Sequence, residues 1–145
     1  GDVNAGDKSE HSVVMMAIQN GHPEVAVKLI VAGAKLDMLN TYGRSVLMEA
    51  TMKGYPEVAA KLIAAGVKID LQCECGNSAL IYASDPDRRM VVAKDGGHHS
   101  EVAVKLIAAG AQLDLQNSEG GTALMGASHC GNHEVVAKLT EAGAK

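Results

Sequence analysis

The sequence predicts an all-α solenoid of stacked helix pairs, and three observations support this fold class. Similar segments recur along the 145 residues, and their Glu-Val pairs are spaced 33, 44 and 33 residues apart. Aromatic residues make up only 2% of the chain, so small aliphatic side chains have to fill the core. Hydroxyl residues and glycines recur in register with the repeats. Because one helix pair cannot bury its apolar face alone, stacked neighbours are required.

The repeats divide a single domain, residues 1–145, into four units. The units are 7–39, 40–72, 73–116 and 117–145. In the last unit Thr140 replaces the isoleucine of the other three, which suits a water-facing repeat. We therefore interpret residues 117–145 as a C-terminal cap.

The first helix of each unit is bounded by recurring residues. It begins after a hydroxyl residue, whose oxygen can accept a hydrogen bond from the first turn. In three units it ends at a glycine, which adopts the left-handed conformation at little cost. These residues are Ser12, Ser45, Ser78 and Thr122 at the start, and Gly21, Gly54 and Gly131 at the end.

The second helix of each unit starts near the Glu-Val pair, whose acidic side chain suits a helix N-terminus. Pro23 and Pro56 precede two of these pairs, at a position where a missing N–H costs nothing. The links that follow alternate short apolar runs with turn residues and are expected to be hairpin-like. The Glu-Val pairs begin at Glu24, Glu57, Glu101 and Glu134, and the helices are expected to end at Gly33, Gly66, Gly110 and Gly143.

The third unit, 73–116, carries an 11-residue insertion between 84 and 100. Pro86 would cost about 3 kcal/mol inside a continuous helix, and Gly96-Gly97 is a strong stop signal. We therefore predict that the first helix of this unit ends near Ser84.

A short extra helix is predicted within the insertion, from about Pro86 to Lys94, with Asp85 as its N-cap. Arg88 and Arg89 would then face water. Two interpretations stay open: a tolerated surface loop, or a docking feature specific to this protein.

Several motifs carry a resemblance to a known family. They are the 33-residue period, GRSVL and GGTAL at the helix starts, GHPEV at 21–25, and AGA followed by a hydrophobic-Asp pair. On these motifs the chain resembles the ankyrin repeat family over essentially its whole length. The opening GDVNAGD resembles the end of a further repeat of that family, so residues 1–6 are interpreted as the end of a preceding repeat and the chain as a piece of a longer array or a trimmed chain. The resemblance implies helix-turn-helix pairs joined by β-hairpin-like loops, acting as a non-catalytic scaffold for protein–protein interaction.

The chain departs from the family at the start of each first helix. The usual Thr-Pro-Leu-His is replaced by SVVM, SVLM, SALI and TALM. The apolar residues at the histidine position cannot make its hydrogen bonds, so apolar packing has to replace them. These residues are Met15, Met48, Ile81 and Met125.

The resemblance also implies where a partner would bind, namely the hairpin tips and the concave face of the first helices. The side chains there differ between repeats while the framework stays nearly constant, as expected of a rigid scaffold that displays variable residues. Tyr42, Arg44 and Met52 belong to types enriched at interfaces, and we predict that they form the centre. The full set of candidates is Lys8, His11, Gln19, Asn20, Thr41, Tyr42, Arg44, Met52, Lys53, Glu74, Asn77, Arg88, Arg89, Ser118, Glu119 and His129.

No catalytic or cofactor site is predicted. The acidic residues recur in register, as structural residues do, and there is no phosphate-binding fingerprint. Cys73 and Cys75 offer too few ligands for a structural zinc site. A metal site built by the two loops that carry His98, His99, His129, His133 and Cys130 is kept as an alternative, although loop histidines are common; no metal is assigned.

Composition limits the remaining possibilities. The net charge of −4 lacks a basic stripe, which argues against nucleic acid, and the apolar runs are too short to span a membrane. Three cysteines do not form a disulfide framework, so we expect an intracellular, cytoplasmic monomer with a protein partner. A structural repeat segment of a larger multidomain protein is the other alternative.

Overall fold

The computed structural model describes residues 13–85 and 98–145, and within these ranges the chain forms eight helices and no strand. The links between repeats contain isolated antiparallel bridges, Leu39 with Ser45 and Gln72 with Ser78. The helices are α1 (Val13–Gln19), α2 (Pro23–Val31), α3 (Val46–Lys53), α4 (Pro56–Ala64), α5 (Ala79–Ser84), α6 (His99–Ala108), α7 (Ala123–Cys130) and α8 (His133–Ala142).

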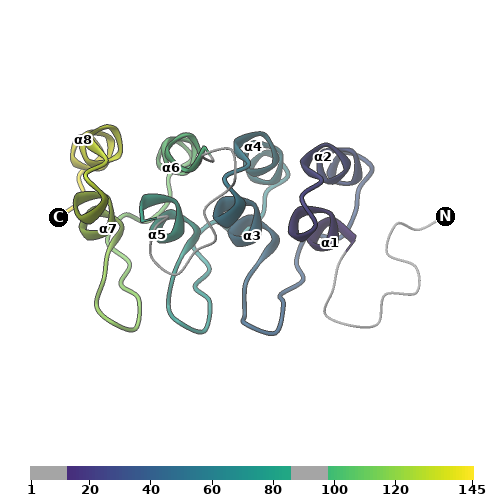
Figure 1. Cartoon of the computed structure of the whole chain (residues 1–145), viewed down its shortest axis with the longest axis horizontal. Coiled ribbons are helices and arrows are strands. Elements are labelled where there is room, and N and C mark those ends of the chain that lie inside the picture. The colour runs from purple at the N-terminus through teal and green to yellow at the C-terminus, as the bar shows by residue number, and fades with distance from the viewer. Residues whose placement is uncertain (1–12, 86–97) are drawn as a thin grey trace.

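The helices form two parallel rows (Figure 1). The first helices α1, α3, α5 and α7 lie in an inner row, and the second helices α2, α4, α6 and α8 lie in an outer row. Neighbours pack against each other along each row, and the two helices of each repeat pack together. The links project as hairpin-like tips from the far side of the inner row. The prediction of an all-α repeat solenoid is confirmed.

The predicted helix boundaries are confirmed at several points. The hydroxyl oxygens of Ser45, Ser78 and Thr122 accept hydrogen bonds from the backbone N–H three residues on, at 3.2, 3.2 and 3.3 Å. Gly54 and Gly131 follow α3 and α7 in the left-handed conformation, with φ of 73° and 69°. The predicted cap Ser12 lies outside the described residues.

The helix α6 begins two residues earlier than the sequence indicated. It starts at His99 rather than near Glu101, because the backbone N–H of Val102 bonds to the carbonyl of His98 and closes the first turn there. The ring of His99 is buried, and its Nε2 lies 2.9 Å from the carbonyl oxygen of Met52 in the preceding repeat. The start of α6 is therefore fixed by a contact between repeats.

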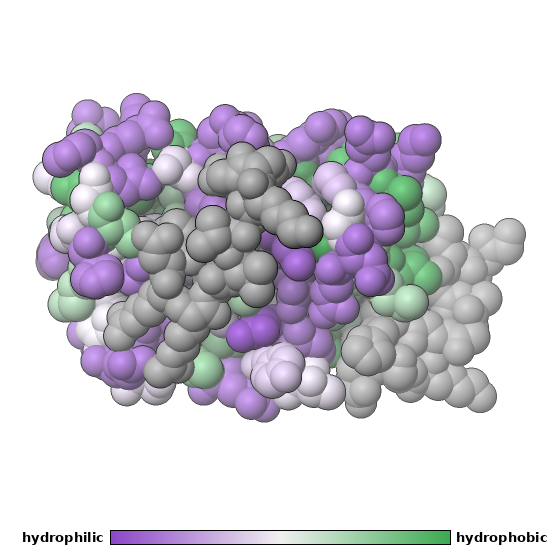
Figure 2. Space-filling model, in the orientation of Figure 1, coloured by the Kyte–Doolittle hydropathy of each residue, from purple (hydrophilic) through white to green (hydrophobic). Residues whose placement is uncertain are grey.

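The core lies between the two rows and is filled by aliphatic side chains, with Leu47, Leu80, Leu106 and Leu139 almost fully buried. Hydrophilic side chains cover most of the outer row, at the top of Figure 2. The lysines that recur there are exposed, as is Thr140 in the last repeat; they are Lys28, Lys61, Lys105 and Lys138.

The expectation of apolar packing at the start of the first helices is wrong for one residue. Met15, Met48 and Ile81 are buried, but Met125 is 57% exposed. This register position faces the following repeat, and no described helix lies on that side of α7.

The described residues reach the edges of the insertion. The first helix ends at Ser84, as predicted. Asp85 completes the end of α5, where its N–H bonds to the carbonyl of Ile81, and it is 5% exposed. The predicted extra helix, with Arg88 and Arg89, lies outside the described residues, as do Lys8 and His11. Among the helices described, none has the length and apolar character needed to cross a membrane.

Candidate functional site

A hollow of about 120 Å³ opens between the hairpin tips and the inner row of helices, across the second, third and fourth repeats. Four of the predicted partner-binding residues line it, namely Arg44, Met52, Asn77 and Glu119. They come from three different repeats, and the stacking of the repeats brings them together.

Arg44 is held in place by two tyrosines. Its guanidinium carbon lies 4.8 Å from the ring centroid of Tyr42 and 5.9 Å from that of Tyr82, and its Nε–H donates to the Tyr82 hydroxyl at 3.3 Å. The Tyr82 hydroxyl also lies 3.1 Å from the sulfur of Cys73. A cation over an aromatic face is stabilised by the ring quadrupole, so the arginine is positioned before any partner arrives.

The surroundings of this group shift two pKa values. Burial raises the pKa of Tyr82, and the Cys73 contact adds to this while Arg44 opposes it. Burial alone would lower the pKa of Arg44, but the hydrogen bond to Tyr82 and the nearby acidic groups outweigh it and raise the pKa. Arg44 is therefore a permanent positive charge in the hollow.

Two asparagines in the same register shape the tips. The Oδ1 of Asn40 accepts from the N–H of Tyr42 and of Arg44, at 2.9 and 3.0 Å. The Oδ1 of Asn117 likewise accepts from the N–H of Glu119 and of Gly121, at 3.0 and 2.8 Å. These bonds satisfy backbone donors that the turns leave unpaired, and they fix the direction of the side chains that line the hollow.

Neighbouring tips are also bonded to each other. The N–H of Glu74 donates to the carbonyl of Tyr42 at 3.2 Å, and the N–H of Ser118 donates to the carbonyl of Cys75 at 2.9 Å. The Ser118 hydroxyl donates to the same carbonyl, and the Gln72 amide bridges to the carbonyl of Gln116 in the next tip.

The remaining predicted residues in the described ranges are spread over the same face but do not line the hollow. Thr41, Tyr42, Glu74 and Ser118 are exposed at the tips. The others lie at the C-terminal ends of inner helices, where the Asn20 amide bonds back to the carbonyl of Met16. They are Gln19, Asn20, Lys53 and His129.

Several residues that line the hollow were missed by sequence reasoning, among them Tyr82, Asp85 and Gly126. The repeat register could have found Asp85. Asp85 occupies the position of Met52 and His129, which were predicted, and the insertion that follows it hid this equivalence.

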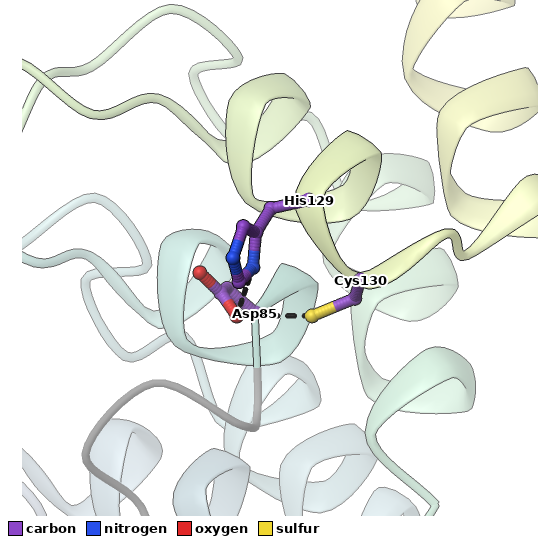
Figure 3. A group of neighbouring side chains, drawn as sticks. All are labelled: Asp85, His129 and Cys130. Atoms are coloured by element: carbon purple, nitrogen blue, oxygen red, sulfur yellow. Dashed lines mark hydrogen bonds and ion pairs between the residues drawn. The ribbon is translucent and has the colours of Figure 1, made fainter.

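The predicted set of metal-binding histidines does not come together. His99 is bonded to Met52, and the Nδ1 of His98 lies 3.5 Å from Glu101. Within the described residues, one group of three metal-ligating side chains has its donor atoms within 4.8 Å of one another, and it contains Asp85, His129 and Cys130 (Figure 3).

Comparison with known proteins agrees with this architecture. A model of ankyrin repeats in three copies matches residues 14–93. A solved structure of an ankyrin repeat domain from Acinetobacter baumannii is similar to the chain, with a TM-score of 0.81 and 31% identity. The match covers 100% of this chain and 71% of that one. No curated protein matches the chain.

Ankyrin repeats are generally protein–protein interaction modules and are typically non-catalytic. The family model matches more than half of the residues, and the solved relative matches all of them. The chain belongs to the ankyrin repeat family.

Proposed function

We propose that this chain binds a protein partner through the face made by the hairpin tips and the inner helices, with the hollow at Arg44 as its centre. The observation that carries the proposal is the convergence of side chains from three repeats on one hollow, beside an arginine that two tyrosines hold in place. Tyr42 is 59% exposed next to it. Arginine and tyrosine are the residues that most often dominate binding energy at interfaces.

The hollow has the dimensions of one side chain of a partner. Its volume of about 120 Å³ suits a single medium-sized group. Arg44 supplies a positive charge and a planar fork of donors, which favours a carboxylate from the partner. The exposed ring of Tyr42 offers an apolar surface beside it. We therefore propose a partner segment that inserts an acidic side chain at this point.

Affinity capture with the purified domain, followed by measurement of the dissociation constant for each captured protein, tests the proposal. Arg44→Ala and Tyr42→Ala are each expected to weaken binding by about 2 kcal/mol, roughly thirtyfold. Lys61→Ala, on the exposed outer row, is the matched control and is expected to leave affinity unchanged. If both tip variants bind as tightly as the wild type, the site lies elsewhere.

The insertion is tested in the same assay. Deletion of residues 86–96 is expected to leave a folded array, as circular dichroism would show. If Arg88 and Arg89 belong to the docking surface, the deletion weakens binding, whereas an unchanged dissociation constant assigns the segment to a tolerated loop.

A further inference from the structure

We propose that Asp85, His129 and Cys130 form a binding site for a transition-metal ion, with Zn²⁺ as the ion that fits best. The site joins the third repeat to the fourth, because Asp85 ends α5 and the other two residues end α7. It does not depend on the proposed partner, and its test is independent of partner binding.

The sulfur of Cys130 and the ring nitrogen of His129 approach the same carboxylate oxygen of Asp85 (Figure 3). The Sγ of Cys130 lies 2.9 Å from the Oδ1 of Asp85, and the Nδ1 of His129 lies 4.0 Å from the same oxygen. Ligand atoms on one tetrahedral zinc ion lie about 3.2–3.8 Å apart, since zinc bonds are about 2.0–2.3 Å long. The third pair, the Cys130 sulfur and the His129 nitrogen, lies within 4.8 Å. Shifts of up to about 1 Å in these side chains would therefore accommodate the ion.

The packing of α5 against α7 positions the Asp85 carboxylate. Asp85 is 5% exposed and packs directly over Gly126, where a Cβ atom would come within 2.7 Å of the Asp85 Cβ. Gly126 occupies the position of Glu49 and Tyr82 in the preceding repeats, so only in the last repeat does the helix leave this space open. This packing restricts where the Asp85 carboxylate can lie.

The other two ligands make the site accessible from solvent. The side chain of His129 is 76% exposed, and Cys130 is half-buried. Asp85 and Gly126 also line the hollow, so an ion can enter from the hollow.

The donor set selects the class of metal. One thiolate, one imidazole and one carboxylate suit Zn²⁺ and its neighbours, whereas Mg²⁺ and Ca²⁺ prefer oxygen ligands alone. Three protein ligands leave one position for water or for a donor from a partner. On binding, the metal replaces the proton of the Cys130 thiol, which is released to solvent.

The competing interpretation is a simple polar contact, in which the Cys130 thiol donates to Asp85 and no metal is bound. The two interpretations differ in one observable, a sulfur–metal bond. Cobalt(II) reports that bond directly, because a thiolate ligand gives an intense near-ultraviolet charge-transfer band and tetrahedral coordination gives strong visible bands.

The test is a titration of the reduced protein with Co²⁺, followed by competition with Zn²⁺. The wild type is expected to show the charge-transfer band, and Zn²⁺ to abolish it. Cys130→Ser is expected to lose the band, and His129→Ala to bind at least about tenfold more weakly. Cys75→Ser and His133→Ala are the matched controls, since both residues are exposed and outside the group, and both variants are expected to keep the band.

Two results would overturn the proposal. One is the absence of a charge-transfer band in the wild type up to about 1 mM Co²⁺. The other is a band that persists in Cys130→Ser or disappears in Cys75→Ser, which would place the sulfur ligand elsewhere. Circular dichroism of each variant confirms that the fold is retained, so that a lost band reports a lost ligand.

Discussion

The second and fourth repeats carry the same asparagine at their tips but connect it differently. The Nδ2 of Asn40 donates to the Oε1 of Glu49 in its own repeat, at 2.7 Å, and both side chains are buried. The Nδ2 of Asn117 donates instead to the Oδ1 of Asn77 in the preceding tip, at 2.9 Å. The register position of Glu49 is occupied in the fourth repeat by Gly126, which has no side chain to receive the bond.

The residue at this register position therefore decides whether the tip asparagine bonds within its own repeat or to the neighbouring repeat. In the second repeat Glu49 fills the space beneath the tip and completes a buried polar contact. In the fourth repeat Gly126 leaves that space open, and Asp85 of the third repeat fills it. The helices stack in the same way in both cases, so the framework tolerates either arrangement.

The largest expected effect comes from removing the buried hydrogen bonds of Asn40 in the second repeat. Asn40→Ala removes the donor to the buried Glu49 side chain and two bonds to the turn, so a loss of about 2–3 kcal/mol in unfolding free energy is expected. Asn117→Ala, whose bonds are more exposed, is expected to lose about 1 kcal/mol. Urea denaturation of both variants measures the difference, and equal losses would contradict the distinction between the two repeats.

A second experiment fills the open space of the fourth repeat. Gly126→Val places a side chain where Asp85 packs, and overpacking of this kind is expected to cost about 1–3 kcal/mol. Ser128→Val, at an exposed position of the same helix, controls for the helix propensity of a β-branched residue. If Gly126→Val loses no more unfolding free energy than Ser128→Val, then Asp85 can move aside freely.

The smallest expected effect concerns the third repeat, where Cys73 replaces the asparagine and contacts Tyr82. Tyr82→Phe removes the hydroxyl that joins Cys73 and Arg44, and it is expected to cost about 0.5–1.5 kcal/mol near neutral pH. Unfolding free energies from urea denaturation of wild type and variant measure this cost.

The pH dependence of the unfolding free energies of wild type and Tyr82→Phe provides a second test. Because the folded pKa of Tyr82 is raised, the unfolded chain loses this proton first. The unfolding free energy of the wild type is therefore expected to fall as pH rises from about 10 towards the folded pKa. The difference in unfolding free energy between wild type and Tyr82→Phe is expected to narrow over the same range. A gap that stays constant up to the highest pH would contradict the raised pKa.

The fold could be predicted from the sequence because the boundaries of the first helices have local causes. The caps at Ser45, Ser78 and Thr122 and the left-handed glycines act within a few residues, so pattern alone located them. The wrong expectation for Met125 has a different origin. Its burial depends on a repeat that would stack on α7, and nothing within the residue's own segment reports on that.

The site was predictable in part, on the tips and at the end of α3. Arg44, Met52, Asn77 and Glu119 were found because their positions vary between otherwise similar repeats. Gly126 was missed because a glycine in a helix indicates weak propensity, and its meaning as a space for another repeat's side chain requires three-dimensional stacking. Asp85 was missed because Pro86, which follows it, is also a signal for the start of a helix.

The bonds between neighbouring tips have a mechanical consequence. Glu74 bonds to Tyr42 and Ser118 bonds to Cys75 through the backbone, which joins the tips of the second, third and fourth repeats. Such bonds weaken over a fraction of an ångström, whereas packed helices slide past one another at low cost. When the array bends, we therefore expect the tips of the second, third and fourth repeats to separate less than their outer helices.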